Sequence, residues 1–337
     1  MASTTTAAVI GCGDVSVVHF EALSGLTDVR LVAVCDVDAV TAAEAGAQFG
    51  VPWFTDHRRL LAEVRPDVVH VCTPHHQHAG PVIDAIDAGV HVLMEKPVAQ
   101  TVAEAERVIA AAEAHPEVKV GVCLQNRYNA TVQAARDLLG SGEVGQAIGG
   151  SGIVLWHRTP GYYEARPWRG TVGTSGGGVL INQAIHTVDL LQWLLGPVVE
   201  VSGQAGRHGA PGAAEVEDTA QLVAQHESGA RSVLFATVAY VQDAPVTVEL
   251  VAERAVLSIR NDLTVSHADG RVDVVEEAMA ATAGRGYWGV SHTELIADFY
   301  RGLDHPAPFW ISPREATKSL RIIADVYAMS RDLVSGP

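Results

Sequence analysis

The sequence predicts an α/β protein in which a parallel sheet covered by helices precedes a second α/β domain with a large, mostly antiparallel, open-faced sheet. Three observations predict this fold. Short apolar runs alternate with amphipathic stretches as far as residue 123. A glycine-containing turn, Gly11–Ser16, follows the first apolar run. Beyond residue 147, runs of alternating apolar and polar residues are joined by short turns.

In the first part, apolar runs predict strands and amphipathic stretches predict helices. The expected strands are Ala7–Ile10, Leu31–Cys35, Val68–Cys72, His91–Met94 and Lys119–Val122, with a short one near Trp53. The expected helices are Val17–Leu26, Thr41–Phe49, His57–Val64, Gln77–Ala88 and Val102–Ala114. Ligands of a parallel sheet bind at the carboxyl ends of its strands.

The pattern of the second part differs. A helix is expected at Ala130–Leu139, a strand at Ala147–Trp156, a glycine- and aromatic-rich loop at His157–Gly178 and a helix at Val179–Leu195. Alternating runs then predict strands at Val198–Gly203, Asp218–Gln225, Arg231–Val241, Val246–Leu250, Ala255–Ile259, Leu263–His267 and Val272–Val275. Two helices close the chain, at His292–Leu303 and Arg314–Val334.

The glycine turn has the pattern of a Rossmann dinucleotide site, which places this domain at residues 1–123 and the second domain at 124–337. Gly11 allows a sharp turn after the strand, and Gly13 leaves room for a pyrophosphate. Ser16 stands where a third glycine is usual, and only a small residue is needed there. Asp14 and Val15 complete the turn, and the helix that follows directs its N–H groups at the phosphates.

Asp36 ends the second predicted strand, 25 residues after Gly11. A carboxylate there accepts hydrogen bonds from the ribose hydroxyls and repels a 2′-phosphate. Val37 and Asp38 follow it, and neither offers a cation to that phosphate. We therefore expect NAD rather than NADP.

Composition excludes several classes of protein. The formal net charge of −16 argues against nucleic acid and anionic membrane surfaces. The sequence has neither the basic N-terminal segment of a signal peptide nor an apolar run of membrane-spanning length. The four cysteines, all within the first 123 residues, have neither metal-site spacing nor a disulfide framework. We expect a cytoplasmic protein.

Lys96 is the first candidate catalytic residue. Glu95-Lys96-Pro97 ends an apolar strand at the edge expected to hold the nicotinamide. An ammonium there can bind a substrate hydroxyl and stabilise charge as hydride leaves its carbon. Pro97 fixes the direction of the lysine, and a cis peptide bond is one way to do so. The alternative is an ordinary solvated lysine.

The helix after Gly176–Gly178 carries a second candidate. Asn182, His186, Asp189 and Trp193 share one face of a regular helix that is otherwise apolar. A histidine in such a stripe can take a hydroxyl proton at neutral pH, with Asp189 orienting it. The alternative is a core histidine bonded to a backbone carbonyl.

The segment Cys72–His78 contains three histidines and a cysteine. We do not interpret it as a metal site, because four ligands within seven residues give poor tetrahedral geometry. Thr73, Pro74 and His78 are instead expected to line the cofactor.

Two smaller clusters follow. Gln125 and Arg127 come directly after the sixth strand, where Gln125 would reach the cofactor together with Glu95, and Arg127 would reach the substrate. Tyr163, Trp168 and Arg169 lie in a loop that could form a lid or a sugar-stacking wall. The alternative for this loop is plain packing.

Taken in order, these motifs resemble the glucose–fructose oxidoreductase/inositol dehydrogenase/rhizopine catabolism (Gfo/Idh/MocA) family. The resemblance covers nearly the whole chain, includes His19 in the first helix and is most specific at Glu95-Lys96-Pro97. It implies NAD(P)-dependent oxidation or reduction of sugars and polyols, with Lys96 and His186 as the catalytic pair. Many members carry an aspartate where this chain has Asn182. An amide takes up no proton, so Asn182 would position substrate and the proton would pass through His186 or Lys96.

The leading hypothesis is therefore an NAD-dependent dehydrogenase that transfers hydride between nicotinamide and a ring carbon of a sugar, cyclic polyol or glycoside. One alternative is a glycoside hydrolase that oxidises its substrate transiently. Another is a non-enzymatic regulator that senses the dinucleotide. An open sheet face is often covered by a second subunit, so we expect a homodimer or homotetramer formed through the C-terminal sheet.

Overall fold

The computed structural model describes residues 4–209, 214–277 and 291–334. The chain forms two compact units. The first comprises Met1–Gln125 and Thr282–Thr317, and the second comprises Asn126–Ala281 and Lys318–Pro337. Among the described residues, 291–317, which the sequence-based boundary assigns to the second domain, belong to the first unit.

The first unit contains a six-stranded parallel sheet in the order β3-β2-β1-β4-β5-β6. Its strands are β1 Thr5–Ile10, β2 Val29–Cys35, β3 Trp53–Phe54, β4 Val68–Val71, β5 His91–Glu95 and β6 Val120–Cys123. Every residue of β4 and β6 is buried. These strands are mostly apolar because both of their faces are covered by helices, and His70 in β4 is the exception. The Rossmann fold expected from the sequence is confirmed.

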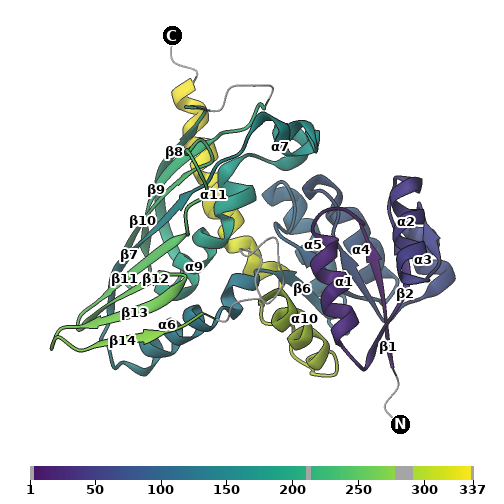
Figure 1. The fold of residues 1–337 in the computed structure, drawn as a ribbon, viewed down its shortest axis with the longest axis horizontal. Helices are drawn as coiled ribbons and strands as arrows, with labels where there is room; N and C mark the ends of the chain where they lie inside the picture. The colour runs from purple at the N-terminus through teal and green to yellow at the C-terminus, as the bar shows by residue number, and fades with distance from the viewer. Residues whose placement is uncertain (1–3, 210–213, 278–290, 335–337) are drawn as a thin grey trace. The chain divides into compact units, whose positions relative to one another are not determined.

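Helices connect these strands in the expected order. They are α1 Ser16–Gly25, α2 Ala39–Phe49, α3 His57–Val64, α4 Ala79–Asp87 and α5 Val102–Ala114, with the short 3₁₀ helix η1 at His75–Gln77 and α10 at Ser291–Arg301. Right-handed crossovers run outward from β1 in both directions, which places α1 and α4 on opposite faces of the sheet. Helix α1 packs against α10, and α4 packs against α5 (Figure 1).

Side-chain caps explain where several helices begin. Asp38 accepts a hydrogen bond from the N–H of Val40, and Asp56 accepts one from Arg58. Thr101 Oγ1 accepts one from Glu104 N–H at 3.2 Å. Each cap satisfies an N–H group that a helix leaves unpaired in its first turn.

The second unit contains an eight-stranded sheet in the order β14-β13-β12-β11-β7-β10-β9-β8. Its strands are β7 Ala147–Leu155, β8 Val198–Gly206, β9 Thr219–His226, β10 Arg231–Thr237, β11 Thr247–Ala252, β12 Ala255–Arg260, β13 Asp262–His267 and β14 Val272–Val275. All neighbouring strands are antiparallel except β7 and β10, which are parallel. The expected mostly antiparallel sheet is confirmed.

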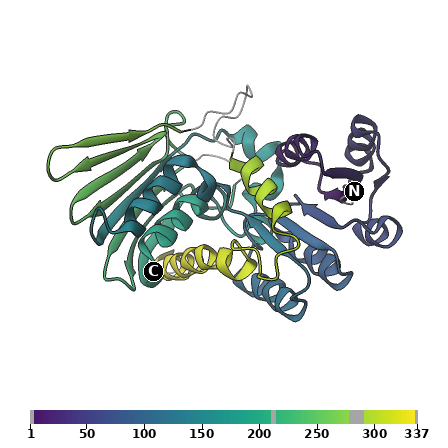
Figure 2. The same ribbon diagram turned by 90° about the horizontal axis from the view of Figure 1, so that it is seen from below.

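The helices of this unit lie on one face of its sheet, as Figures 1 and 2 show for α6 and α9. They are α6 Ala130–Ser141, α7 Pro160–Glu164, α8 Val172–Ser175 and α9 Ile185–Leu195, and α11 Pro313–Val334 ends in this unit. No described segment covers the other face in either view. Burial alternates along β9 and β10, and the residues pointing away from the helices are exposed.

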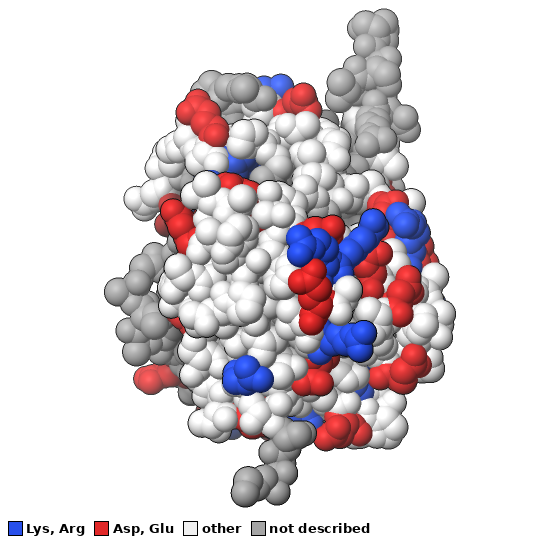
Figure 3. All heavy atoms as spheres, turned by 90° about the vertical axis from the view of Figure 1, so that its right-hand side faces the viewer, with Lys and Arg blue, Asp and Glu red and all other residues white. Residues whose placement is uncertain are grey.

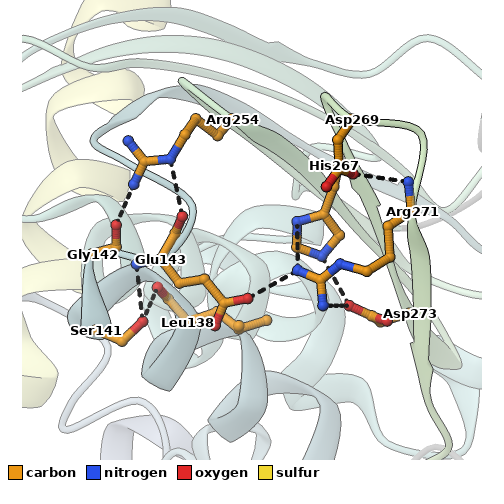
Figure 4. Close-up of polar contacts among 9 residues, drawn as sticks. All are labelled: Leu138, Ser141, Gly142, Glu143, Arg254, His267, Asp269, Arg271 and Asp273. Carbon is orange, nitrogen blue, oxygen red and sulfur yellow. Dashed lines mark hydrogen bonds and ion pairs between the residues drawn. The ribbon is translucent and has the colours of Figure 1, made fainter.

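A polar cluster fastens the end of α6 to the outer strands of the sheet (Figure 4). Arg254 donates hydrogen bonds to the carbonyls of Gly142 and Glu143, the two residues directly after α6. Arg271 forms ion pairs with Glu143 at 3.0 Å and with Asp273 at 3.0 Å. The cluster therefore ties the loop after α6 to β14.

Charged side chains of both signs share the surface. Figure 3 shows Lys and Arg interspersed with Asp and Glu on the face that it draws. On α3, Arg59 pairs with Glu63 at 2.9 Å and Arg58 pairs with Asp84 at 2.8 Å. Among the described residues, the helices are all too short or too polar to cross a membrane.

Candidate active site

The glycine turn connects β1 to α1 at the carboxyl edge of the first sheet. Gly11 has a φ of +92°, and a Cβ there would lie 2.6 Å from the backbone of Cys72, so only glycine fits. A Cβ at Gly13 would meet no protein atom within 4 Å. Ser16 is buried and donates a hydrogen bond to the Gly13 carbonyl at 2.7 Å. The turn thus leaves open space at Gly13, where a pyrophosphate is expected.

Asp36 is fixed beside this turn. One carboxylate oxygen accepts a hydrogen bond from Cys12 N–H at 2.8 Å, and the other accepts one from Asp38 N–H at 3.0 Å. The side chain remains partly exposed, and Val37 next to it is 76% exposed. The carboxylate therefore stands in a defined position at the end of β2.

His78 is fully buried and joins two loops of the same edge. Its Nδ1 lies 2.7 Å from the carbonyl oxygen of Pro97, and its Nε2 lies 2.8 Å from that of Thr73. Burial lowers the pKa of this imidazole. The ring connects the loop after β4 to the loop after β5, while Thr73 and Pro74 themselves remain partly exposed.

Lys96 follows β5 directly. Between Val92 and Ala99 it is the one position that is not buried. The Lys96–Pro97 peptide bond is cis, one of the arrangements expected from the sequence. Gln125, which follows β6, is 3% exposed, and its Oε1 has no hydrogen-bond partner among the described residues.

Beneath Lys96 lies a buried cluster that sequence reasoning did not assemble. Glu95 Oε1 accepts hydrogen bonds from His19 Nε2 and His292 Nε2, both at 3.1 Å. Glu95 Oε2 accepts one from the backbone N–H of Lys96 at 3.2 Å. Burial alone would raise the pKa of Glu95, but the two imidazole donors outweigh it and hold that pKa well below its usual range.

The cluster extends through two more side chains. His19 Nδ1 lies 2.7 Å from His70 Nδ1, and His70 Nε2 lies 2.9 Å from the Tyr300 hydroxyl. Burial lowers the pKa of both histidines, so both are neutral at pH 7. The Glu95 carboxylate can only accept, which fixes the order of donation as Tyr300 to His70 to His19 to Glu95.

The ligand-type atoms of His19, Glu95 and His292 lie within 4.8 Å of one another. The hydrogen bonds among them account for this spacing. In the described part of the chain, no other group of three or more His, Cys, Asp or Glu side chains meets that criterion, so Cys72–His78 does not form one. Of the three residues, His19 is indicated in the sequence only by the family resemblance, and nothing local links it to the other two.

In the second unit, the candidate helix differs in one respect from the regular helix that was expected. Leu180–Ala184 forms a π-helical turn, and the α-helix α9 begins at Ile185. A π turn holds more residues than an α turn, so the assumed uniform spacing through Asn182 is wrong. From Gly177 to Gln192, Asn182 and His186 are the two positions that are not buried. Asn182 and His186 are therefore the two partly exposed side chains of this otherwise buried segment.

The glycines before this helix allow a close contact with Glu217. Its carboxylate accepts hydrogen bonds from Gly178 N–H at 2.6 Å, Leu180 N–H at 3.0 Å and the Tyr327 hydroxyl at 2.7 Å. A Cβ at Gly178 would lie 1.9 Å from the Glu217 carbonyl oxygen, and one at Gly177 would lie 2.2 Å from the Tyr327 hydroxyl. Glu217, which the sequence analysis did not single out, thus caps the helical segment that carries His186.

Asp189 pairs with Arg127 in the second unit. Two parallel hydrogen bonds of 2.7 Å and 2.6 Å join the guanidinium to the carboxylate, and both side chains are almost fully buried. The guanidinium also lies 5.1 Å from the ring centre of Trp193. This bidentate pair fixes α9 to the segment after β6.

The segment expected as a loop, 157–178, contains α7, the 3₁₀ helix Pro167–Gly170 and α8. Tyr162 lies at its centre. Its hydroxyl accepts hydrogen bonds from the amides of Asn182 at 3.4 Å and Gln183 at 3.2 Å. Arg169 lies 4.4 Å from the Tyr162 ring centre.

Tyr163 and Trp168 belong to the same segment and are partly buried. Burial raises the pKa of Tyr163 to about 12. The aromatic and arginine side chains of this segment stack on one another, and Arg169 also lies 5.7 Å from the Trp168 ring centre.

A cavity of about 590 Å³ opens at the amino ends of β4 and β5, the edge opposite the glycine turn. Arg58, Arg65, Asp67 and Asp84 contribute to its lining, and the charges of Arg58 and Asp84 are paired. It does not coincide with the carboxyl edge, where parallel sheets bind nucleotides.

A six-stranded parallel sheet with this glycine turn and an acid fixed after β2 defines a dinucleotide-binding protein. Residues 5–123 match the family described as "Oxidoreductase family, NAD-binding Rossmann fold". Residues 132–258 match the "GFO/IDH/MocA C-terminal domain". The two matches together cover more than half of the chain. This protein belongs to the GFO/IDH/MocA family of NAD-binding oxidoreductases.

Curated relatives include sugar and polyol dehydrogenases. D-apiose dehydrogenase from Paraburkholderia graminis is 29% identical over 69% of this chain and 62% of that enzyme. Inositol 2-dehydrogenase 2 from Saccharopolyspora erythraea is 28% identical over 77% of this chain and 74% of that enzyme. The match to D-apiose dehydrogenase thus spans less than two thirds of its length.

Among solved structures, the WlbA dehydrogenase from Bordetella pertussis, in complex with NADH and UDP-GlcNAcA, superposes with a TM-score of 0.85. It is 28% identical, and the match covers 98% of this chain and 97% of that one. Levoglucosan dehydrogenase, solved with NADH and levoglucosan, has a TM-score of 0.84 at 21% identity and shares the fold.

Proposed function

We propose that this protein transfers a hydride between the nicotinamide of NAD and a ring carbon of a sugar, cyclic polyol or glycoside. The observation that supports this most is the partial exposure of Lys96, Asn182 and His186, each a polar side chain within an otherwise buried segment. The names of the curated relatives support the substrate class, since they include an apiose, an inositol and a glucoside dehydrogenase.

In this proposal NAD supplies the hydride acceptor, held by the glycine turn and Asp36, with Thr73, Pro74 and Gln125 beside it. Lys96 donates a hydrogen bond to the substrate hydroxyl and stabilises the negative charge that develops on its oxygen. His186 takes the hydroxyl proton, since an imidazole titrates near neutral pH.

Asn182 orients the substrate by hydrogen bonding, because an amide neither gives nor takes a proton at neutral pH. Its Nδ2 donates a hydrogen bond to the Tyr162 hydroxyl, which holds the amide in one orientation. Arg127, Tyr163, Trp168 and Arg169 are proposed to border the substrate. Arg127 would act mainly by holding α9, given its bidentate pair with Asp189.

The direct test is stopped-flow absorbance at the NADH band, with NAD and a panel of inositols, aldoses and glycosides. The proposal predicts NADH formation with at least one class of ring polyol. Tight NAD binding without NADH formation across the whole panel contradicts it. Release of free sugar from a glycoside without net NADH would instead indicate hydrolysis through transient oxidation.

We further propose that a homo-oligomer forms through the open face of the second sheet. Val223 and Val233 are paired in register on β9 and β10 and are 47% and 45% exposed. Phe235, on the same face, is 39% exposed. Light scattering of Val233→Lys against wild type tests this: a smaller particle is expected, and an unchanged mass contradicts it.

The cytoplasm is the proposed location. All four cysteines are free, three of them are buried, and burial raises the pKa of Cys35 to about 12. Thiols of this kind act as small core residues and suit a reducing compartment.

A further inference from the structure

The Glu95 carboxylate is a buried negative charge at the carboxyl end of β5. It is 4% exposed and receives hydrogen bonds from His19, His292 and the Lys96 backbone. Cys123 lies opposite Glu95 on β6. A carboxylate that receives hydrogen bonds from three donors is an ionised acceptor.

Two of the histidines in this network bring no compensating cation to the carboxylate. His19 and His70 are neutral, because burial lowers their pKa values and their hydrogen bonds form a single directed chain from Tyr300. The chain from Tyr300 through His70 and His19 therefore donates to Glu95 without cancelling its charge.

The order of the strands places this charge on the nicotinamide side of the site. Asp36 follows β2 and the glycine turn follows β1, so the adenosine ribose and the pyrophosphate belong to those two strands. The rest of the dinucleotide then extends over β4 and β5. Neighbouring strands are about 4.8 Å apart, so the end of β5 lies roughly 10 Å from that of β1.

The two redox states of nicotinamide differ by one charge on the ring, which is positive in NAD⁺ and neutral in NADH. A fixed anion on that side of the sheet stabilises the oxidised ring relative to the reduced one. The effect survives in the protein interior, where the dielectric constant is low and salt screens little.

We infer that Glu95 tunes the bound cofactor toward its oxidised state by favouring the binding of NAD⁺ over NADH. This rests on the proposed function only in requiring the dinucleotide at the carboxyl edge, and it is independent of the substrate. The consequence for turnover is easier release of NADH after a substrate has been oxidised.

The experiment compares the dissociation constants of NAD⁺ and NADH, by calorimetry and NADH fluorescence, in wild type and Glu95→Gln. Removing the charge is expected to raise the ratio Kd(NAD⁺)/Kd(NADH) on the order of tenfold, the effect of one charge within roughly 10 Å at an effective dielectric constant of about 20. Glu95→Asp keeps the charge and is expected to keep the wild-type ratio.

Asp67→Asn is the matched control. It removes a carboxylate from the amino edge of the same sheet, where Asp67 accepts hydrogen bonds from Thr6. The ratio should remain at the wild-type value. If Glu95→Gln does not fold, the double variant Glu95→Met/His292→Leu replaces the charge and one donor by apolar groups, a change that buried ionic sites often tolerate, and the same rise is expected.

The outcomes separate this inference from the proposed function. An unchanged ratio in the uncharged variants, with both cofactors bound, overturns the tuning role and leaves the dehydrogenase proposal standing. Failure of wild type to bind either cofactor overturns both. A ratio that rises in Glu95→Gln and rises equally in Glu95→Asp assigns the effect to shape rather than charge and also overturns the inference.

Discussion

The carboxylate of Asp36 accepts a hydrogen bond from the backbone N–H of Cys12 at 2.8 Å, which fixes the acid after β2 onto the glycine turn after β1. The two parts of the dinucleotide site are thus held in one arrangement before any cofactor binds. Site geometry that exists before binding reduces the entropy lost on binding.

Asp36→Ser should therefore shift cofactor preference. It removes the charge that repels a 2′-phosphate and one acceptor for the ribose hydroxyls. We expect weaker NAD binding and an NADP/NAD affinity ratio raised about tenfold or more, because one charge pair carries that much free energy at short range. Calorimetry with both cofactors measures the ratio. Asp38→Asn, which alters only the cap of α2, is the control, and an equal shift in that variant would contradict the assignment.

The two glycines of the turn should respond differently to alanine. Gly11→Ala places a Cβ 2.6 Å from the Cys72 backbone at a φ of +92°, so it should destabilise the protein by about 1–3 kcal/mol or more. Gly13→Ala meets no protein atom and should preserve the melting temperature while weakening NAD binding. Thermal unfolding and NAD titration of the two variants distinguish these effects. Equal loss of stability in both would mean that Gly13 has a structural role.

Acid should destabilise the first unit through the buried histidines. His19 and His70 have lowered pKa values in the fold, so the unfolded chain binds more protons once the pH falls below about 6.5. Stability is therefore full above that pH and is lost below it, by up to about 1.4 kcal/mol per pH unit for each histidine. Glu95 adds a further loss below about pH 4.5, because its pKa is lowered in the fold.

Urea unfolding at a series of pH values measures this loss. His70→Gln should show a smaller decline between about pH 6.5 and 5, because one buried neutral histidine is gone. His115→Gln, at an exposed ion pair, is the control and should follow wild type. A decline in His70→Gln as steep as in wild type would exclude His70 as its source.

Tyr327 should stabilise the second unit through the acid that it contacts. Tyr327→Phe removes a hydroxyl donor from the partly buried Glu217 carboxylate and should cost about 1.5–3 kcal/mol, the range for hydrogen bonds to charged groups. Tyr300→Phe removes a donor from neutral His70 and should cost about 0.5–1.5 kcal/mol. Urea unfolding of both variants tests this order, and the reverse order would contradict an ionised Glu217.

Local patterns predicted much of the fold. The helix at Val102–Ala114 and the strand at Val272–Val275 have the expected bounds, because a threonine cap begins the helix and the turn residues Asp269 and Gly270 shortly precede the strand. The expectation failed at Leu180–Ala184, where the π turn leaves no signature in residue spacing. It also failed in 157–178, where helices of four or five residues are too short for periodicity to reveal.

For the candidate site too, the sequence could locate some residues and could not locate others. Lys96 and Asp36 stand at strand ends, so the order of the strands along the chain is enough to find them. The His19–Glu95–His292 cluster combines residues of α1, β5 and α10 that lie far apart in the chain. Glu217 lies two residues before β9, and its carboxylate contacts Gly178 at the start of the helical segment that carries His186. Such contacts depend on tertiary packing, which spacing along one segment does not encode.

Single-turnover stopped-flow kinetics with an active ring polyol tests the chemistry most directly, in wild type, Lys96→Met and His186→Asn with saturating NAD. Both variants should bind NAD as wild type does and form NADH at least about 10²-fold more slowly, the usual contribution of a positioned acid or base. Wild-type rates of NADH formation in either variant would contradict the proposed catalytic role of the residue that it replaces.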